Sequence, residues 1–156
     1  MESTQYILQI LEAYEDEVAG AAYFDGLALA YPQQSAFLER CAALERETAT
    51  QLRALLQKYQ LTPRAQTVLE ERGALDARKD AGSDCKKLMQ QSIKSYAGYV
   101  AQFKALEAMG PMEDQRILAA LTAHEIQLIE WIRAETGHSC KRGFSGVKKG
   151  NGSSRR

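Results

Sequence analysis

Hydrophobic residues recur every three or four positions along most of this chain, which is the spacing of one buried face on an α-helix. Strand-like alternation of apolar and polar residues is absent from the sequence. We therefore predict an all-α protein. The pattern predicts four long helices and one shorter helix, over about residues 4–31, 34–60, 63–79, 84–109 and 113–136.

Local signals predict where these helices begin and end. Ser3 or Thr4 can cap the first helix, and Pro32 ends it. Thr62 and Pro63 form a cap followed by proline at the first helical position, which predicts the start of the shorter helix.

The second half of the chain carries similar signals. Residues 81–84 break the chain and cap the third long helix, which ends at Gly110-Pro111. Gly137 is expected to end the last helix because glycine commonly terminates helices.

The connections between helices predict their arrangement. Short turns at 31–33 and 110–111 make the first two and the last two long helices antiparallel pairs. About 22 residues connect the second long helix to the third, enough to travel along a bundle. This favours an antiparallel four-helix bundle with a helical crossover over residues 1–136, and an up-down bundle with a capping helix is the alternative.

Composition predicts a cellular location and a distinct C-terminal tail. The three cysteines have no metal-ligand spacing, which favours a reduced, cytoplasmic setting with Cys41 as a small core residue. We find no signal-peptide pattern and no apolar run of about 20 residues, so no membrane segment is expected. Residues 137–156 hold six basic residues and no acid, which predicts a disordered basic Gly/Ser-rich tail. We favour a solvated terminus over a nucleic-acid-binding arm, because Phe144 is its sole aromatic residue.

Polar residues interrupt the apolar faces at one level of the predicted bundle. Glu17, Glu45, His124 and Glu125 lie near the middles of their helices, at similar heights when counted from the shared turns. Buried carboxylates are costly unless they are paired or bound to a cation, and several at one level repel each other. This level is therefore the candidate metal site.

Three segments carry a resemblance to a known superfamily. They read EDEVAGAAYF at 15–24, LERETATQLR at 44–53 and LTAHEIQLIEW at 121–131. The chain resembles the ferritin-like, rubrerythrin-like superfamily over about residues 4–136. The resemblance implies a two-metal pattern of one Glu on the first and third long helices and Glu-x-x-His on the second and fourth.

By that pattern, Glu17, Glu45 and Glu125 match carboxylate ligands, whereas Thr48 and Leu128 stand where histidines are expected. The third long helix supplies no central acid. One interpretation is a complete di-iron oxidase, and a second is a single metal held by the three glutamates with His124 or water. In the third, metal-free interpretation, the glutamates hydrogen-bond nearby side chains. The candidates for those bonds are Tyr14, Thr48, Tyr96, Tyr99 and His124.

The missing histidines favour a non-catalytic protein that binds a partner or a small ligand and has no cofactor. The alternative is a metal-dependent oxidoreductase with iron or manganese in a rearranged site of Glu17, Glu45, His124 and Glu125. His124 precedes Glu125 by one residue and is expected to point about 100° away from it. A homodimer is expected from the length of the bundle. We find no nucleophile–base set or phosphate-binding loop, so no catalytic residue is assigned.

Overall fold

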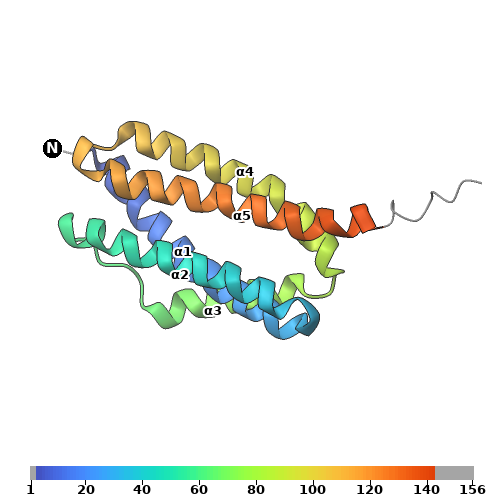
Figure 1. Cartoon of the computed structure of the whole chain (residues 1–156). Helices are drawn as coiled ribbons and strands as arrows, with labels where there is room; N and C mark the ends of the chain where they lie inside the picture. The colour runs from blue at the N-terminus through green and yellow to red at the C-terminus, as the bar shows by residue number, and fades with distance from the viewer. Residues whose placement is uncertain (1–2, 143–156) are drawn as a thin grey trace, which may run out of the picture.

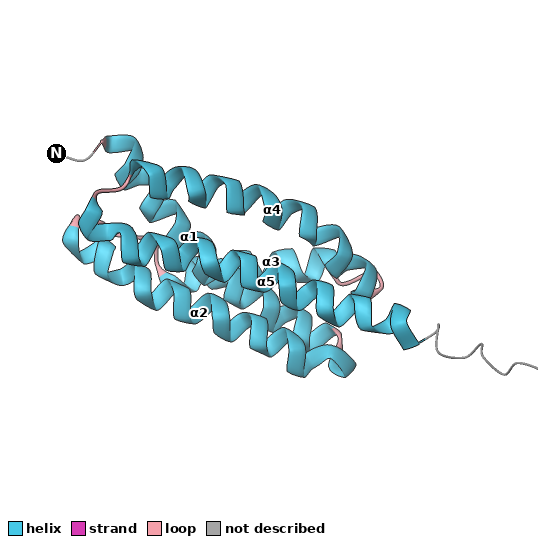
Figure 2. Ribbon diagram, turned by 45° about the horizontal axis from the view of Figure 1, so that its top comes forward, coloured by secondary structure: helices cyan, strands magenta, loops and turns pink. Residues whose placement is uncertain are grey.

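The computed structural model describes residues 3–142, which form only helices and connecting turns (Figures 1 and 2). This part of the chain contains no β-strand, so the predicted all-α class is confirmed. The five α-helices are α1 (Thr4–Ala30), α2 (Ser35–Lys58), α3 (Gln66–Asp80), α4 (Cys85–Met109) and α5 (Gln115–Arg142).

Two short 3₁₀ turns join neighbouring long helices. Pro32–Gln34 connects α1 to α2, and Met112–Asp114 connects α4 to α5. Because these connections are short, each pair runs antiparallel, and Figure 1 shows the two pairs side by side. The connection from α2 to α4 contains α3 and leads from one end of the molecule to the other, so α4 starts at the end opposite to where α2 stops.

The α3 helix packs on α1 through small residues. A Cβ atom added at Gly73 would lie 2.0 Å from the backbone oxygen of Ala19, and one added at Gly26 would lie 2.6 Å from the Cβ of Ala77. These distances require glycine, and they bring the two backbones into close contact. Among Val68, Leu69 and Leu75, the larger apolar residues of this helix, only Leu69 is buried.

Two apolar clusters fill the interior, one toward each end of the long helices. The first includes Tyr6, Ile10, Leu52, Leu55, Phe103, Leu106, Leu118 and Leu121. The second includes Phe24, Leu27, Leu38, Cys41, Met89, Leu128 and Ile132. On α1, α2 and α5, the residues between the two clusters include the predicted polar ones, which therefore occupy the middle of the interior.

Two predicted helix ends are wrong. The short helix begins at Gln66 rather than near Pro63, because Arg64 is bound to Glu15 of α1 through its backbone N–H (3.3 Å) and its side-chain Nε (2.6 Å). The last helix does not stop at Gly137 but continues to Arg142. Residues 143–156, most of the predicted basic tail, lie outside the described part of the chain. Among the described residues, no helix combines the length and the apolar character needed to cross a membrane.

Candidate metal centre

The four predicted site residues lie together in the middle of the interior. Glu17 comes from α1, Glu45 from α2, and His124 and Glu125 from α5. All four are at least 95 % buried. We call these four residues the central cluster.

His124 holds the central cluster together. Its Nδ1 atom contacts the carbonyl oxygen of Leu121, which can only accept a hydrogen bond, so Nδ1 carries a proton and donates. Its Nε2 atom faces carboxylate oxygens from three helices. The nearest are Oε2 of Glu17 at 2.9 Å, Oε2 of Glu125 at 3.3 Å and Oε2 of Glu45 at 3.4 Å.

Two of these buried atoms have no hydrogen-bond partner. They are Nε2 of His124 and Oε2 of Glu17, and although they are close, they are not aligned for a hydrogen bond. Buried polar atoms nearly always have partners, so such an orphaned pair calls for an explanation. A histidine that donates from one ring nitrogen to a backbone carbonyl and offers the other to a cluster of acids has the arrangement of a metal ligand.

The spacing of these atoms suits one metal ion. One ligand atom from each of Glu17, Glu45 and His124 lies within 4.8 Å of the other two. Two ligand atoms that are each about 2.1 Å from a metal ion are about 3.0 Å apart at a right angle and about 3.4 Å apart at the tetrahedral angle. The separations around Nε2, from 2.9 to 3.4 Å, cover this interval.

The raised pKa values in the central cluster show that burial and the crowding of carboxylates disfavour their charged forms. Burial raises the pKa of Glu17 well above its ordinary value, and the negative charge of Glu45 adds to this rise. Burial alone would lower the pKa of His124, but the facing carboxylates of Glu17 and Glu45 outweigh it and raise the pKa to about 11. The metal-free cluster therefore retains protons at neutral pH.

Glu125 behaves in the same way. Burial and the charge of Glu45 raise its pKa to about 8, although His124 opposes the shift. Its Oε2 atom lies 3.3 Å from Nε2 of His124, so the two groups meet although the residues are about 100° apart around the helix. Their side chains leave α5 in different directions but are long enough to converge.

The residues at the positions of the missing histidines take no part in the cluster. The hydroxyl of Thr48 donates to the carbonyl oxygen of Leu44 in its own helix (2.9 Å), and Leu128 is fully buried in the second apolar cluster. Imidazole therefore enters the site at one position, His124, instead of at the two positions that the resemblance implies.

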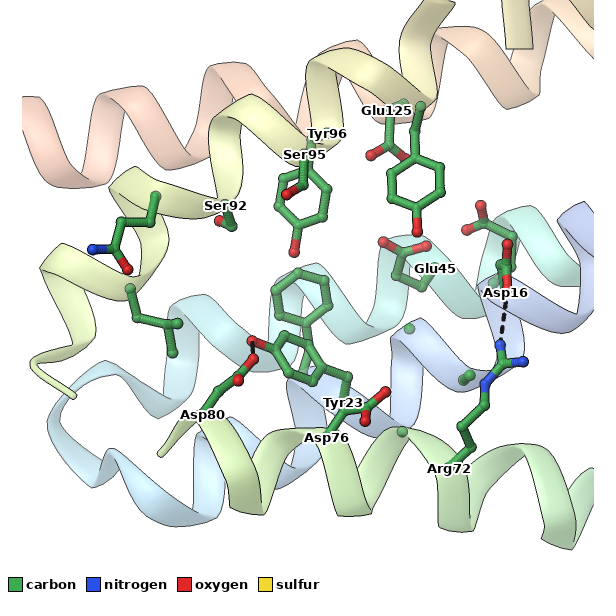
Figure 3. A pocket seen from close by; sticks show the side chains of 18 of the residues that line it. Asp16, Tyr23, Glu45, Arg72, Asp76, Asp80, Ser92, Ser95, Tyr96 and Glu125 are labelled. Atoms are coloured by element: carbon green, nitrogen blue, oxygen red, sulfur yellow. Dashed lines mark hydrogen bonds and ion pairs between the residues drawn. The ribbon is translucent and has the colours of Figure 1, made fainter. Parts of the chain in front are cut away.

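A cavity of about 490 Å³ opens beside the central cluster (Figure 3). Glu17, Glu45 and Glu125 line it, so three of the four cluster residues border on this space. The rest of its wall comes mainly from one face of α1, from α3 and from the middle of α4. A metal ion in the cluster would therefore lie next to space for a small molecule.

Sequence reasoning missed the contribution of α3 to this cavity. Arg72, Asp76 and Lys79 line the cavity, and Asp76 and Lys79 are also exposed to solvent. Arg72 also donates to a carboxylate oxygen of Asp16 on α1 (2.8 Å). The signal in the sequence is the small pair Gly73 and Ala77, whose spacing places one side of α3 against α1.

Comparison with known proteins finds no match. The chain matches no protein-family model, no curated protein and no solved structure. The resemblance to the ferritin-like superfamily therefore remains a prediction. The evidence for a function comes from the residues of the central cluster.

Proposed function

We propose that this protein binds one divalent metal ion, manganese or iron, through Glu17, Glu45 and His124, with Glu125 beside them. The observation that carries the proposal is Nε2 of His124, which is buried, has no hydrogen-bond partner and lies within 3.4 Å of three carboxylate oxygens. Carboxylates with one imidazole form a mostly oxygen ligand set, which suits these two metals.

A metal ion explains the cluster better than a proton does. A proton on Nε2 can point at one oxygen only, and none of the three is aligned to accept it. A divalent ion would contact the nitrogen and several oxygens at once and would balance the charges of two carboxylates. It would also stabilise the charged carboxylates of Glu17 and Glu45 in the interior of the protein.

The cavity favours the sequence-based alternative, a metal-dependent oxidoreductase, because it places open space directly against the proposed ligands. Bound iron or manganese would supply redox chemistry there. The chain's own residues would hold the ion, exclude bulk water from it and keep a carboxyl group, that of Glu125, next to the cavity.

The ferritin-like arrangement belongs to the same proposal. Its support is the pairing of α1 with α2 and of α4 with α5, and a connection through α3 that runs the length of the molecule. The cytoplasmic location and the homodimer inferred from the sequence also remain predictions.

The test is metal binding by purified protein. The chelator-treated protein is loaded anaerobically with Mn²⁺ or Fe²⁺, and its metal content is measured by mass spectrometry. We expect one equivalent in the wild type and an affinity lowered by more than about tenfold in Glu45→Ala. The matched control is Glu47→Ala, which removes an exposed glutamate from the same helix and should bind normally.

Absence of metal from the wild type under these conditions would refute the proposal. The second candidate would then stand, a metal-free protein that binds a small ligand, which is favoured by the cavity alone. Circular dichroism of Glu45→Ala checks that any loss of metal does not reflect unfolding.

A further inference from the structure

Two cavities of similar size but different chemistry lie beside α1 in the described part of the chain. The first, about 490 Å³, adjoins the central cluster, and the second, about 470 Å³, lies on another side of α1 and is lined by residues of α1, α2 and α3. Two acids and two bases line the second cavity, and no aromatic ring does. The second cavity therefore serves as a comparison for the first, because its lining charges are balanced and it has no aromatic wall.

The first cavity is strongly acidic. Six acidic residues line it, but only two basic ones, Arg72 and Lys79, do. One of the two bases, Arg72, is already paired with Asp16. A divalent ion in the central cluster would offset two of the negative charges and leave acids in excess. Without the metal, Glu17 and Glu125 retain protons and His124 carries a positive charge, so the excess of negative charge is smaller but keeps its sign. The cavity therefore attracts cations and repels anions in both states.

Aromatic rings form much of the remaining wall. They are Tyr23, Phe24, Tyr96, Tyr99 and Phe103. Figure 3 shows Tyr23 and Tyr96 facing the space from opposite sides, from α1 and α4. The faces of such rings attract an organic cation, and their apolar area accommodates its hydrocarbon part.

One buried atom in this wall has no partner. Glu17, which is 97 % buried, lines the cavity, and its Oε2 atom, which faces Nε2 of His124, has no hydrogen-bond donor. Nearer to solvent, Asp76 and Asp80 of α3 also line the cavity, and Asp80 accepts a hydrogen bond from Tyr23 (2.8 Å). Acceptors therefore lie both deep in the cavity and close to its exposed side.

From this combination we propose that the cavity beside the central cluster takes a small organic cation, an amine that carries an apolar or aromatic group. Its ammonium would lie among the acids and its apolar part against the rings. The inference rests on the proposed function, because it names the class of molecule that the metal site would meet. A volume of about 490 Å³ suits one such molecule.

The test compares three probes that share one shape and differ in charge. Benzylamine, benzyl alcohol and benzoate are titrated by calorimetry into the protein with and without bound Mn²⁺. We expect benzylamine to bind more than about tenfold more tightly than benzyl alcohol, and benzoate to bind weakest. The metal-free protein should still bind benzylamine more tightly than benzoate, since recognition is by charge rather than by coordination to the metal.

Variants away from the proposed ligands locate the binding. Tyr96→Leu removes a ring and Asp76→Asn removes an acid near solvent, and each should weaken benzylamine binding several-fold while leaving metal content unchanged. Glu70→Gln, in the second cavity, is the matched control and should have no effect.

The outcomes separate the two proposals. Benzylamine that binds no better than benzoate, or only when metal is bound, overturns the organic-cation inference and leaves the metal site intact. Normal benzylamine binding by a protein that takes up no metal overturns the proposed function and supports the amine cavity. Unchanged binding by both Tyr96→Leu and Asp76→Asn would show that the amine binds elsewhere and would also overturn the inference.

Discussion

Carboxylates are buried in opposite ways at one end of the described interior and in its middle. At one end of the interior, Asp114 is 99 % buried and surrounded by donors. In the middle, the carboxylates of Glu17, Glu45 and Glu125 are buried almost as deeply but share a single nitrogen-bearing neighbour, His124. Similar burial therefore leads to different electrostatics.

Asp114 has all the partners that a buried carboxylate needs. It accepts hydrogen bonds from Tyr6 (2.7 Å), Tyr59 (2.5 Å) and Lys58 (2.6 Å). Burial alone would raise its pKa, but these donors outweigh burial and hold the pKa below its usual value. This aspartate is charged, satisfied and structural.

The central cluster lacks such donors, and the pKa values of Glu17 and Glu125 are raised instead. The difference teaches that burial alone does not mark a functional carboxylate. The informative feature is a buried carboxylate whose neighbours are other acids, because its charge is then not balanced by nearby donors and its pKa is perturbed.

The largest effect that distinguishes the two regions should come from Asp114→Ala. The substitution leaves the buried hydroxyl of Tyr6 without an acceptor and removes the partner of Lys58, so we expect a loss of about 4 kcal/mol in the free energy of unfolding. Chemical denaturation measures it. Asp25→Ala, which removes an exposed ion pair with Arg46, is the control and should change stability by less than about 0.5 kcal/mol. Equal losses in both variants would contradict the structural role of Asp114.

The next effect is the pH dependence of the metal-free protein. The pKa of Glu125 is about 8 when folded and 4.5 ordinarily, so the folded state binds its proton more tightly. The stability that this proton confers is fully present below about pH 4.5 and is lost as the pH rises to 8. We expect the free energy of unfolding to fall by about 2 kcal/mol or more between pH 5 and pH 8.

His124 should extend this decline. Its pKa is raised to about 11 from 6.5, so its contribution is present below pH 6.5 and is lost as the pH rises toward 11. Asp114 has the opposite sign, since its lowered pKa gives stability that is lost only in acid. Denaturation of wild type and Glu125→Gln across this range tests the assignment. A decline of the same size in Glu125→Gln would show that other groups cause it.

The smallest effect should come from Gly20→Ala, which touches the central cluster without changing its charge. The added Cβ would lie 3.4 Å from the carboxyl carbon of Glu45, which is an ordinary but close contact. Alanine also favours the helix, so we expect stability to change by less than about 1 kcal/mol. Because the added methyl group fits without moving Glu45, metal affinity, measured by calorimetry, should change by less than about threefold. A much larger loss of affinity would contradict this close but unstrained packing of Gly20 against Glu45.

Much of the fold was predictable from local signals in the sequence. Asp84 caps α4, with its side chain accepting from the backbone N–H of Lys87, and the first helix ends just before Pro32, as predicted. The wrong helix ends have tertiary or energetic causes. Arg64 is held to Glu15, 49 residues earlier, and a glycine such as Gly137 costs a helix only about 1 kcal/mol.

The site was predictable in its members but not in its geometry. Counting residues along each helix brought Glu17, Glu45, His124 and Glu125 to one level, and the structure places them together. Sequence could not show that the Nε2 atom of His124 lies among the three carboxylates, because that depends on rotamers and on the distance between helices. The role of Asp114 was missed for a similar reason, since Tyr6 and Lys58 come from distant parts of the chain.

Two walls of the cavity beside the central cluster differ in how closely they are packed. On the α1–α3 side, the backbones touch at Gly73, so moving that wall would require two helices to separate. On the opposite side, α4 has buried residues only near its ends, at Cys85, Met89, Phe103 and Leu106, and none over the three turns between. Amide hydrogen exchange should therefore be faster in the middle of α4 than in α1 beside Gly73, because fewer buried contacts oppose its local opening.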